Sequence, residues 1–187
     1  MKILGIEGSP RKDGNTEKLV KQVLAGALEE GCQTEFLKLA DLTIDYCQGC
    51  GSCRATGQCV IEDDMDRVVD AIQQSDCIVL GSPIYAWQVS GTTKVFMDRL
   101  CRLLTPKYQS RLNGAKRIAF AYTQGNPDPD LFKPYFDYQE KLYAFLGFTL
   151  AGRVQAVGTR AEDDILSQDQ VLAGAHVFGK DLAGKNR

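Results

Sequence analysis

The chain has 187 residues, with 22 Lys and Arg residues against 24 Asp and Glu residues and a formal net charge of −2. A chain of this length can bury a hydrophobic core without disulfides or metals, and the near balance of charge argues against a nucleic-acid-binding surface. No apolar segment at the start is long enough for a signal peptide, and no apolar run approaches the length of a membrane span. We therefore expect a single cytoplasmic domain over residues 1–187, with neither a nucleic acid nor a membrane as partner.

Hydrophobic periodicity predicts five strands that alternate with five helices. The strands are expected at residues 3–6, 34–39, 77–80, 118–122 and 148–157. The helices are expected at residues 16–30, 63–72, 92–104, 134–146 and 164–182, before a polar tail at 184–187. The run from Cys77 to Leu80 is apolar throughout, which is typical of a strand buried on both faces of a parallel sheet. Because each parallel crossover needs a helix, the pattern predicts an α/β fold with a doubly wound parallel sheet.

The stretch from Gly8 to Thr16, between the first strand and the first helix, contains hydroxyl, amide and guanidinium groups. Backbone N–H groups and the positive end of the helix dipole should point into this loop, so we predict a phosphate site. Five residues separate Gly8 from Gly14, and Asn15 stands where a P-loop has its lysine. The loop therefore suits a monophosphate better than a triphosphate or a dinucleotide. The alternative is an ordinary helix-capping turn.

In doubly wound sheets the ligand lies beyond the carboxyl ends of the strands, where the strand order changes direction. Three loops meet this description, at residues 8–16, 82–91 and 123–130. We expect these loops to form one site together.

Four of the seven cysteines fall in one short segment, as Cys47, Cys50, Cys53 and Cys59. The two-residue spacing of the first three allows thiolates to surround a 4Fe-4S cluster, with the fourth returning as a ligand. A zinc site and a metal-free thiol loop are the alternatives. The remaining cysteines, Cys32, Cys77 and Cys101, are expected to be small buried hydrophobic residues.

Two motifs resemble those of the flavodoxin-like NAD(P)H-dependent FMN reductases. The first is Gly8-Ser9-Pro10-Arg11 with Asn15-Thr16, and the second is Gly81-Ser82-Pro83-Ile84-Tyr85, followed by Lys94 and Phe96-Met97-Asp98-Arg99. With the cysteine motif, the resemblance is closer to the iron-sulfur flavoproteins of that group. It covers about the first 100 residues, and Thr123-Gln124-Gly125-Asn126 adds a third ligand loop.

This resemblance implies a flavodoxin-like, doubly wound, five-stranded parallel sheet with helices on both faces and a noncovalent FMN. It implies that the FMN phosphate is held by Ser9, Arg11, Asn15 and Thr16, that Pro83, Ile84 and Tyr85 lie against the isoalloxazine ring, and that Thr123 and Gly125 complete the site. It also implies NAD(P)H or ferredoxin as electron donor, a small-molecule or protein electron acceptor, and a homodimer or homotetramer. We expect no catalytic side chain, because hydride transfer to a flavin requires no side-chain acid or base.

Three functions follow from these interpretations. In the first, FMN exchanges electrons with a 4Fe-4S cluster held by Cys47, Cys50, Cys53 and Cys59. In the second, the protein is a cluster-free NAD(P)H-dependent FMN or quinone reductase. In the third, it is a non-enzymatic FMN redox carrier or sensor.

Overall fold

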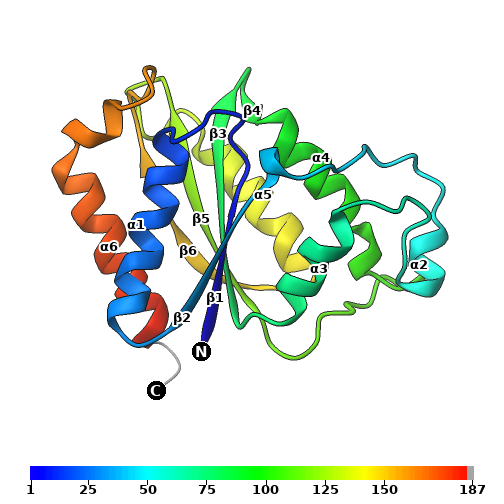
Figure 1. Ribbon diagram of the computed structural model, residues 1–187. Coiled ribbons are helices and arrows are strands. Elements are labelled where there is room, and N and C mark those ends of the chain that lie inside the picture. Colours follow the sequence, from blue (N-terminus) through cyan, green and yellow to red (C-terminus); the bar gives the residue numbers. More distant parts are fainter. Residues whose placement is uncertain (185–187) are drawn as a thin grey trace.

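Five parallel strands form the centre of the structure, in the order β2-β1-β3-β5-β6 (Figure 1). The computed structural model describes residues 1–184. The strands are β1 (Lys2–Glu7), β2 (Gln33–Lys38), β3 (Cys77–Tyr85), β5 (Arg117–Gln124) and β6 (Thr149–Ala156). A two-residue strand, β4 (Gln88–Val89), pairs antiparallel with the end of β3. The predicted five-stranded parallel sheet is confirmed, and β4 makes the sheet six-stranded.

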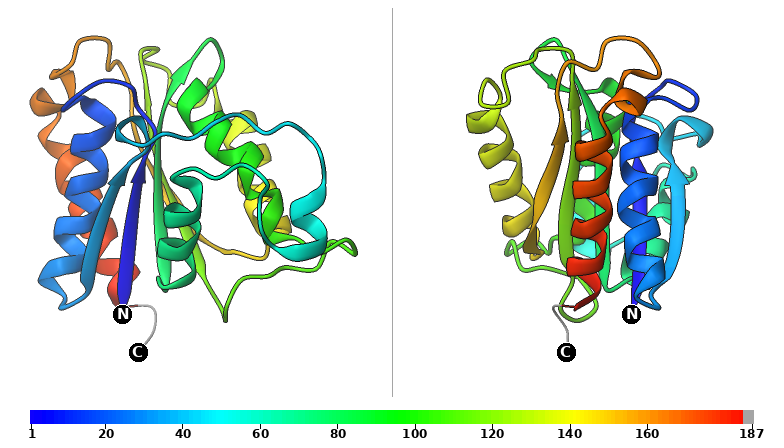
Figure 2. Two further views of the ribbon diagram at one scale, coloured as in Figure 1. Left: turned by 45° about the vertical axis from the view of Figure 1, so that its right-hand side comes forward. Right: turned by 90° about the vertical axis from the view of Figure 1, so that its left-hand side faces the viewer.

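Helices cover both faces of this sheet, as Figure 2 shows from two sides. On one face lie α1 (Asn15–Glu29) and α6 (Asp169–Gly184). On the other lie α3 (Met65–Gln73), α4 (Gly91–Arg99) and α5 (Lys133–Phe145). Shorter helical segments are η1 (Leu39–Asp41), α2 (Ser52–Thr56), η2 (Leu100–Leu103) and η3 (Asp164–Ser167).

The central strands are buried on both faces because their side chains alternate between two hydrophobic clusters. On β3, Val79 packs toward α1 and α6, whereas Ile78 and Leu80 pack toward α3 and α4. On β5, Ala121 faces α1 and α6, whereas the large Phe120 ring faces the opposite side. The two sides of the sheet therefore have separate cores.

Two glycines allow α1 and α6 to lie side by side. A Cβ atom at Gly26 would collide with the backbone of His176, and one at Gly179 would collide with the backbone of Val23. Only glycine permits such close approach of two helix backbones, so these positions fix the packing of α1 against α6.

The structure differs from the predicted elements at four places. The helix predicted at 164–182 is divided, because η3 occupies 164–167 and α6 begins at Asp169. β3 continues to Tyr85, because its last residues pair with β5 as far as Gln124, so the predicted loop at 82–91 is mostly a hairpin. The helix predicted at 92–104 ends at Arg99 and continues as η2. The cysteine segment contains α2, which the sequence did not indicate because glycines flank so short a helix. Of the predicted tail at 184–187, residues 185–187 lie outside the described part.

The strand order changes direction between β1 and β3, since β2 extends the sheet on one side and β5 and β6 extend it on the other. A crevice is expected at the carboxyl ends of such strands. Among residues 1–184 no helix has both the length and the apolar character needed to cross a bilayer.

Candidate functional site

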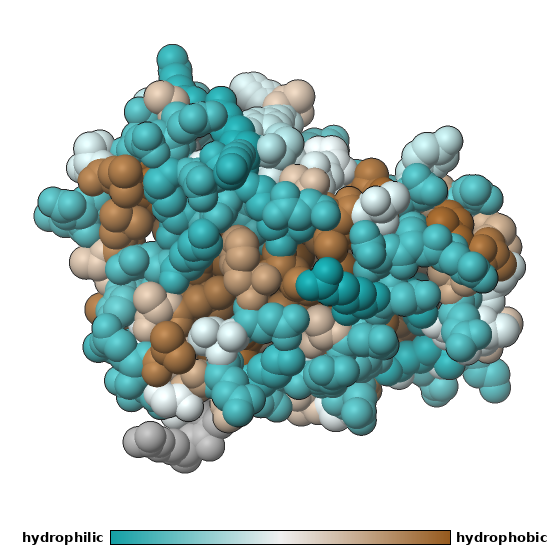
Figure 3. Space-filling view, viewed as in Figure 1, coloured by the Kyte–Doolittle hydropathy of each residue, from teal (hydrophilic) through white to brown (hydrophobic). Residues whose placement is uncertain are grey.

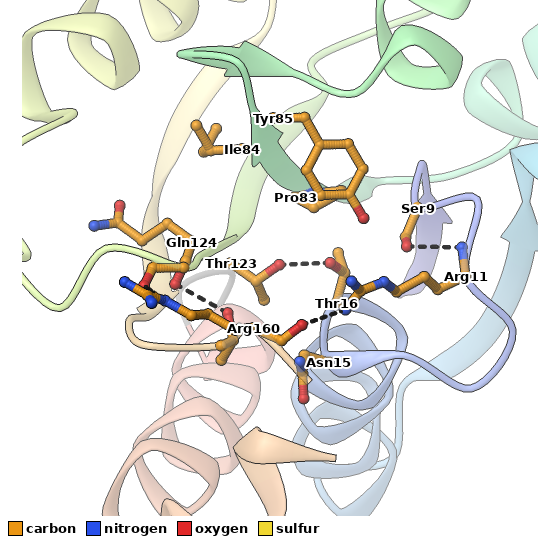
Figure 4. A pocket seen from close by; sticks show the side chains of 12 residues that line it. Ser9, Arg11, Asn15, Thr16, Pro83, Ile84, Tyr85, Thr123, Gln124 and Arg160 are labelled. Atoms are coloured by element: carbon orange, nitrogen blue, oxygen red, sulfur yellow. Dashed lines mark hydrogen bonds between the residues drawn. The ribbon is translucent and has the colours of Figure 1, made fainter. Parts of the chain in front are cut away.

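A cavity of about 270 Å³ opens at the carboxyl ends of β1, β3 and β5 (Figure 4). All nine residues that the sequence analysis assigned to the cofactor line this cavity: Ser9, Arg11, Asn15, Thr16, Pro83, Ile84, Tyr85, Thr123 and Gly125. Three further residues line it: Gln124, which belongs to the predicted third loop, and Thr159 and Arg160, which were not predicted. The three predicted loops therefore meet in one site.

The loop from β1 to α1 is held in shape by its own polar groups. The Ser9 N–H donates to Glu7 Oε1 at 2.8 Å, and the Arg11 N–H donates to Ser9 Oγ at 3.1 Å. The first N–H groups of an α-helix have no acceptor within the helix. Because α1 begins at Asn15, its first turn directs such N–H groups and the positive end of the helix dipole at the cavity. This arrangement suits an anion.

The Asn15 side chain is already hydrogen-bonded within the protein. Its Nδ2 donates to the Ala161 carbonyl at 2.6 Å, and its Oδ1 accepts the Ile165 N–H at 3.0 Å. The amide therefore fastens the segment after β6 to the start of α1. Its backbone N–H, rather than its side chain, is the group suited to a ligand.

Several hydrogen bonds connect the ligand loops and the strands that carry them, among them one from Ser90 Oγ to the Gly8 carbonyl. Thr16 Oγ1 and Thr123 Oγ1 lie 2.6 Å apart in the interior, and the Gly8 N–H donates to the Gly81 carbonyl at 2.9 Å. A side chain at Gly8 would collide with Thr93, which explains the glycine at this position. The three loops therefore form a connected rim.

The hairpin from β3 to β4 forms another side of the cavity, and Figure 4 shows Ile84 and Tyr85 opposite Asn15, Thr16 and Arg160. Ala86 and Trp87, at the hairpin tip, both have positive φ angles, of 45° and 69°. Two consecutive residues of this kind suit the tight turn of a two-residue hairpin but are uncommon without glycine.

The aromatic rings of this hairpin lie at the surface. Tyr85 is 38% exposed and Trp87 is 60% exposed. The Trp87 ring meets the Phe132 ring edge to face, with centroids 5.4 Å apart, and the Val89 N–H donates to the Tyr135 hydroxyl. The hairpin thus offers flat aromatic surface beside the cavity, of the kind that stacks on a planar heterocycle.

Arg160 enters the site from the segment after β6. Its Nε donates to the Gly125 carbonyl at 3.0 Å, and its carbonyl accepts Arg11 Nη1 at 2.8 Å. The Asp164 carboxylate accepts the N–H groups of Arg160 and Ala161 at 2.7 Å. The position of Arg160 could have been predicted from the sequence, because residues that follow the last parallel strand emerge at the same edge of the sheet as the other ligand loops.

Glu7 lies fully buried beneath the first loop. Burial raises its pKa to about 7, although the Ser9 N–H and the nearby Lys38 ammonium act in the opposite direction. Within residues 1–184, Glu7 Oε2 has no hydrogen-bond partner. This carboxyl group was not identified from the sequence, because a glutamate that ends a buried strand gives no periodic signal.

Behind the same loop, Lys38 and Glu17 form a nearly buried ion pair of 2.8 Å. Lys38 Nζ also donates to the Arg11 carbonyl at 2.7 Å. Burial by itself would raise the pKa of Glu17, but hydrogen bonds from Lys21 and Lys38 lower it to about 2. The ion pair therefore supports the loop from beneath.

A second cavity, of about 320 Å³, is lined by the cysteine segment. All four predicted metal ligands, Cys47, Cys50, Cys53 and Cys59, line it, and so does Cys101 of η2. The prediction for Cys32 and Cys77 is confirmed, since both are buried, but Cys101 is only partly buried. In Figure 3 hydrophobic residues reach the surface at the end of the molecule where Figure 1 shows this segment.

The thiols of this cavity differ in acidity. Burial and contacts with Cys53 and Cys47 raise the pKa of Cys101 to about 12. Cys50 is exposed, and hydrogen bonds from Ser52 lower the pKa of its thiol. Of Cys50 and Cys101, Cys50 therefore forms a thiolate more readily.

The donor set fits a cluster in kind, because thiolates are the usual ligands of iron-sulfur clusters. Arg99 also lines this cavity, and within residues 1–184 its buried Nε has no partner. A guanidinium suits the negative charge of several thiolates. As arranged, however, no group of three or more His, Cys, Asp or Glu side chains in the described part of the chain could hold a metal ion.

The chain is similar to several known proteins. Residues 1–128 match the family model of NADPH-dependent FMN reductase. An iron-sulfur flavoprotein of Methanocaldococcus jannaschii is 46% identical over 99 residues, which cover 53% of this chain and 51% of that protein. An iron-sulfur flavoprotein of Methanosarcina thermophila is 37% identical over 99 residues, covering 53% and 52%. The chain thus spans about half the length of these curated relatives.

Solved structures share the fold. An NAD(P)H:quinone oxidoreductase from Methanothermobacter marburgensis superposes with a TM-score of 0.74 at 14% identity, covering 97% of this chain and 98% of that one. This likeness shows a flavodoxin-like fold. The match over residues 1–128 establishes that the chain belongs to the NADPH-dependent FMN reductase family.

Proposed function

We propose that this chain is an FMN-dependent oxidoreductase that takes electrons from NAD(P)H. The observation that carries the proposal is the single cavity lined by all nine residues assigned from the sequence. Its polar end, at the start of α1, suits a phosphate, and its aromatic hairpin suits a flat ring. The family match supports FMN as the ligand.

The protein residues would bind and orient the cofactor. The phosphate would be held by the Ser9 and Thr16 hydroxyls, the Arg11 guanidinium and the first N–H groups of α1. Arg160 adds a second guanidinium to the lining of the cavity, beside the Gly125 carbonyl that accepts its Nε–H. The segment from Pro83 to Tyr85 would lie against the isoalloxazine ring, and Thr123 and Gly125 would border its polar edge.

FMN supplies the redox chemistry when bound, since it accepts a hydride and returns electrons singly or in pairs. The chain needs no side-chain acid or base for hydride transfer, so we assign no catalytic residue. The partly exposed Tyr85 ring leaves an open side of the cavity, where a nicotinamide or an acceptor can approach.

The test is a flavin analysis of the purified protein with assays of NADH and NADPH oxidation, using a quinone or free FMN as acceptor. We expect about one FMN per chain and oxidation of at least one nicotinamide. A protein that binds neither FMN nor riboflavin would contradict the proposal.

We further propose that a 4Fe-4S cluster is held by Cys47, Cys50, Cys53 and Cys59, so that FMN and the cluster exchange electrons. Support comes from the shared cavity of these thiols and from the names of two relatives. A cluster would supply one-electron transfer and could link the flavin to ferredoxin or another one-electron partner. Because the thiols are not arranged around a metal as they stand, loading would require movement of the glycine-rich segment between Gly49 and Gly57.

Iron and sulfide analysis after anoxic purification tests the cluster. We expect about four irons per chain and loss of iron in Cys50→Ser. Cys32→Ala is the matched control, since Cys32 lies away from this cavity. An iron-free protein from anoxic, iron-replete cells would contradict the cluster but would leave the FMN proposal intact.

A second candidate is a cluster-free FMN or quinone reductase. The specific observation in its favour is that no preformed metal-binding group exists within residues 1–184. NAD(P)H oxidation that is unchanged in Cys50→Ser would favour this candidate. We also propose that the chain forms a single functional domain. We propose further that it assembles into a homodimer or homotetramer, and sedimentation would test this assembly.

A further inference from the structure

Cys101 lies outside the spaced cysteine motif, yet its sulfur is next to one of the motif thiols. Cys53 Sγ and Cys101 Sγ are 3.5 Å apart, although 48 residues separate them in the sequence. Cys53 comes from α2 and Cys101 from η2. The two thiols face each other across two different elements of the fold.

This proximity is maintained by contacts that do not involve sulfur. Arg102 Nε donates to the Gly57 carbonyl at 3.1 Å, directly after α2. Arg111 Nη2 donates to the carbonyls of Arg54 and Ala55 at 2.6 and 3.2 Å. These arginines dock α2 against η2, so the two sulfurs are held as neighbours without a metal.

The segment can also make the small movement that a covalent bond requires. A disulfide brings its sulfurs to about 2.05 Å, so this pair must close by roughly 1.5 Å. α2 has five residues, and both flanking glycines, Gly51 and Gly57, have left-handed φ angles of 75° and 82°. Cys53 belongs to neither hydrophobic cluster of the sheet, so a shift of α2 leaves the core intact.

Reagents can reach the pair from two sides. Both thiols line the cysteine cavity, and Cys101 also lines a neighbouring groove of about 320 Å³ together with Met97 and Leu142. Cys101 is partly exposed. The site is therefore open to small redox-active molecules.

We propose that Cys53 and Cys101 form a reversible disulfide, a second redox site distinct from the flavin. The oxidant is a low-molecular-weight disulfide. One cysteine of the pair, as the thiolate, attacks a sulfur of that disulfide, forms a mixed disulfide and releases one thiol. The other cysteine then attacks the mixed disulfide, so that the Cys53–Cys101 bond forms and the second thiol leaves. Two protein thiols are oxidised, one small disulfide is reduced, and the two protons end on the released thiols.

One consequence rests on the proposed cluster. Cys53 is one of the four thiols assigned to iron, whereas Cys101 is not. The disulfide removes Cys53 from that set, so oxidised protein should not acquire iron until it is reduced. The fold then couples cluster assembly to the thiol redox state of the surroundings.

The first experiment uses iron-free wild-type protein treated with glutathione disulfide and then alkylated and digested with trypsin. We expect peptide 39–54, which ends at Arg54, to be joined to the tripeptide Leu100-Cys101-Arg102, with fragmentation assigning the bond to Cys53. Dithiothreitol should separate the two peptides. Cys101→Ser should lack the crosslink, and Cys32→Ala should retain it. If Cys101 remains fully alkylatable after oxidation of the folded wild type, the proposal is wrong.

The second experiment measures iron bound after anoxic reconstitution with ferrous iron and sulfide. Pre-oxidised wild type should bind far less iron than reduced wild type, and dithiothreitol should restore binding. Cys101→Ser should bind iron equally well with or without pre-oxidation. Loss of iron in reduced Cys101→Ser would make Cys101 a ligand and overturn the proposed coupling. If no variant binds iron in any state, the cluster proposal fails, whereas the crosslink still tests the disulfide independently.

Discussion

Thr16 Oγ1 and Thr123 Oγ1 lie 2.6 Å apart, and this buried hydrogen bond joins the first and third ligand loops. Replacement of either residue by Val leaves the other hydroxyl without its partner in the interior. We expect Thr123→Val to lower the free energy of unfolding by about 1–3 kcal/mol.

A double-mutant cycle with Thr16→Val, read by urea denaturation, separates this bond from other effects. The double variant should lose less stability than the sum of the single variants, because no orphaned hydroxyl remains. Strictly additive losses would show that the hydroxyls do not interact.

Arg11 provides the test of the phosphate end of the cavity. A guanidinium that bonds a phosphate contributes about 1.5–3 kcal/mol, so Arg11→Ala should raise the Kd for FMN roughly 10- to 150-fold. Binding of riboflavin, which has no phosphate, should change little. Titration of flavin fluorescence measures both ligands. Lys12→Ala is the control, because Lys12 is exposed and does not line the cavity.

Glu7 should make stability depend on pH in a defined direction. Its pKa rises from 4.5 to about 7 on folding, so its contribution to stability is fully present below about pH 4.5 and is lost as the pH rises through 7. Glu7→Gln should remove this loss, which amounts to at most about 3 kcal/mol. Urea denaturation of both proteins at about pH 5 and about pH 8 measures the difference. Parallel pH profiles for the two proteins would exclude this role of Glu7.

Lys38 and Lys21 both bond Glu17 but differ in burial. The Lys38 side chain is 9% exposed and the Lys21 side chain is 54% exposed. We expect Lys38→Met to cost about 1.5–3 kcal/mol, because a buried charged hydrogen bond is lost. Lys21→Met should cost less than about 1 kcal/mol, since exposed ion pairs contribute little. Equal losses in thermal or urea unfolding would show that burial does not distinguish the two lysines.

Arg99 anchors the start of the cysteine segment. It bonds both carboxylate oxygens of Asp63, at 2.6 and 3.0 Å, and donates to the Asp45 carbonyl at 2.7 Å. Arg99→Ala leaves Asp63 buried and unpaired, so we expect a loss of about 3–5 kcal/mol. The exposed pair of Lys94 and Asp98 supplies the control, Lys94→Ala. Faster alkylation of the segment's thiols in Arg99→Ala should accompany the loss, and unchanged rates would contradict the anchoring role.

The sequence by itself determined the α/β class, the five parallel strands and the three loops that meet at the FMN-type cavity. The spacing of hydrophobic residues along strands and helices can be recognised within short segments of sequence. Parallel strands also bring the loops that follow them to one edge of the sheet. The loops that contain Ser9, Pro83 and Thr123 could therefore be assigned to one site, whereas the family resemblance selected the individual residues. The short strand β4 was not predicted, because two residues are too few to show a periodic pattern.

Only the tertiary structure decided which polar groups remain available for a ligand. It showed that the Asn15 amide is already bonded to Ala161 and Ile165, and that Arg160 enters the cavity. It also placed Cys101 beside Cys53, whereas the sequence pattern had grouped Cys101 with the inert core. The physical reason is the same in each case: these contacts join residues far apart in the chain, and their partners are set by the packing of the elements rather than by local spacing.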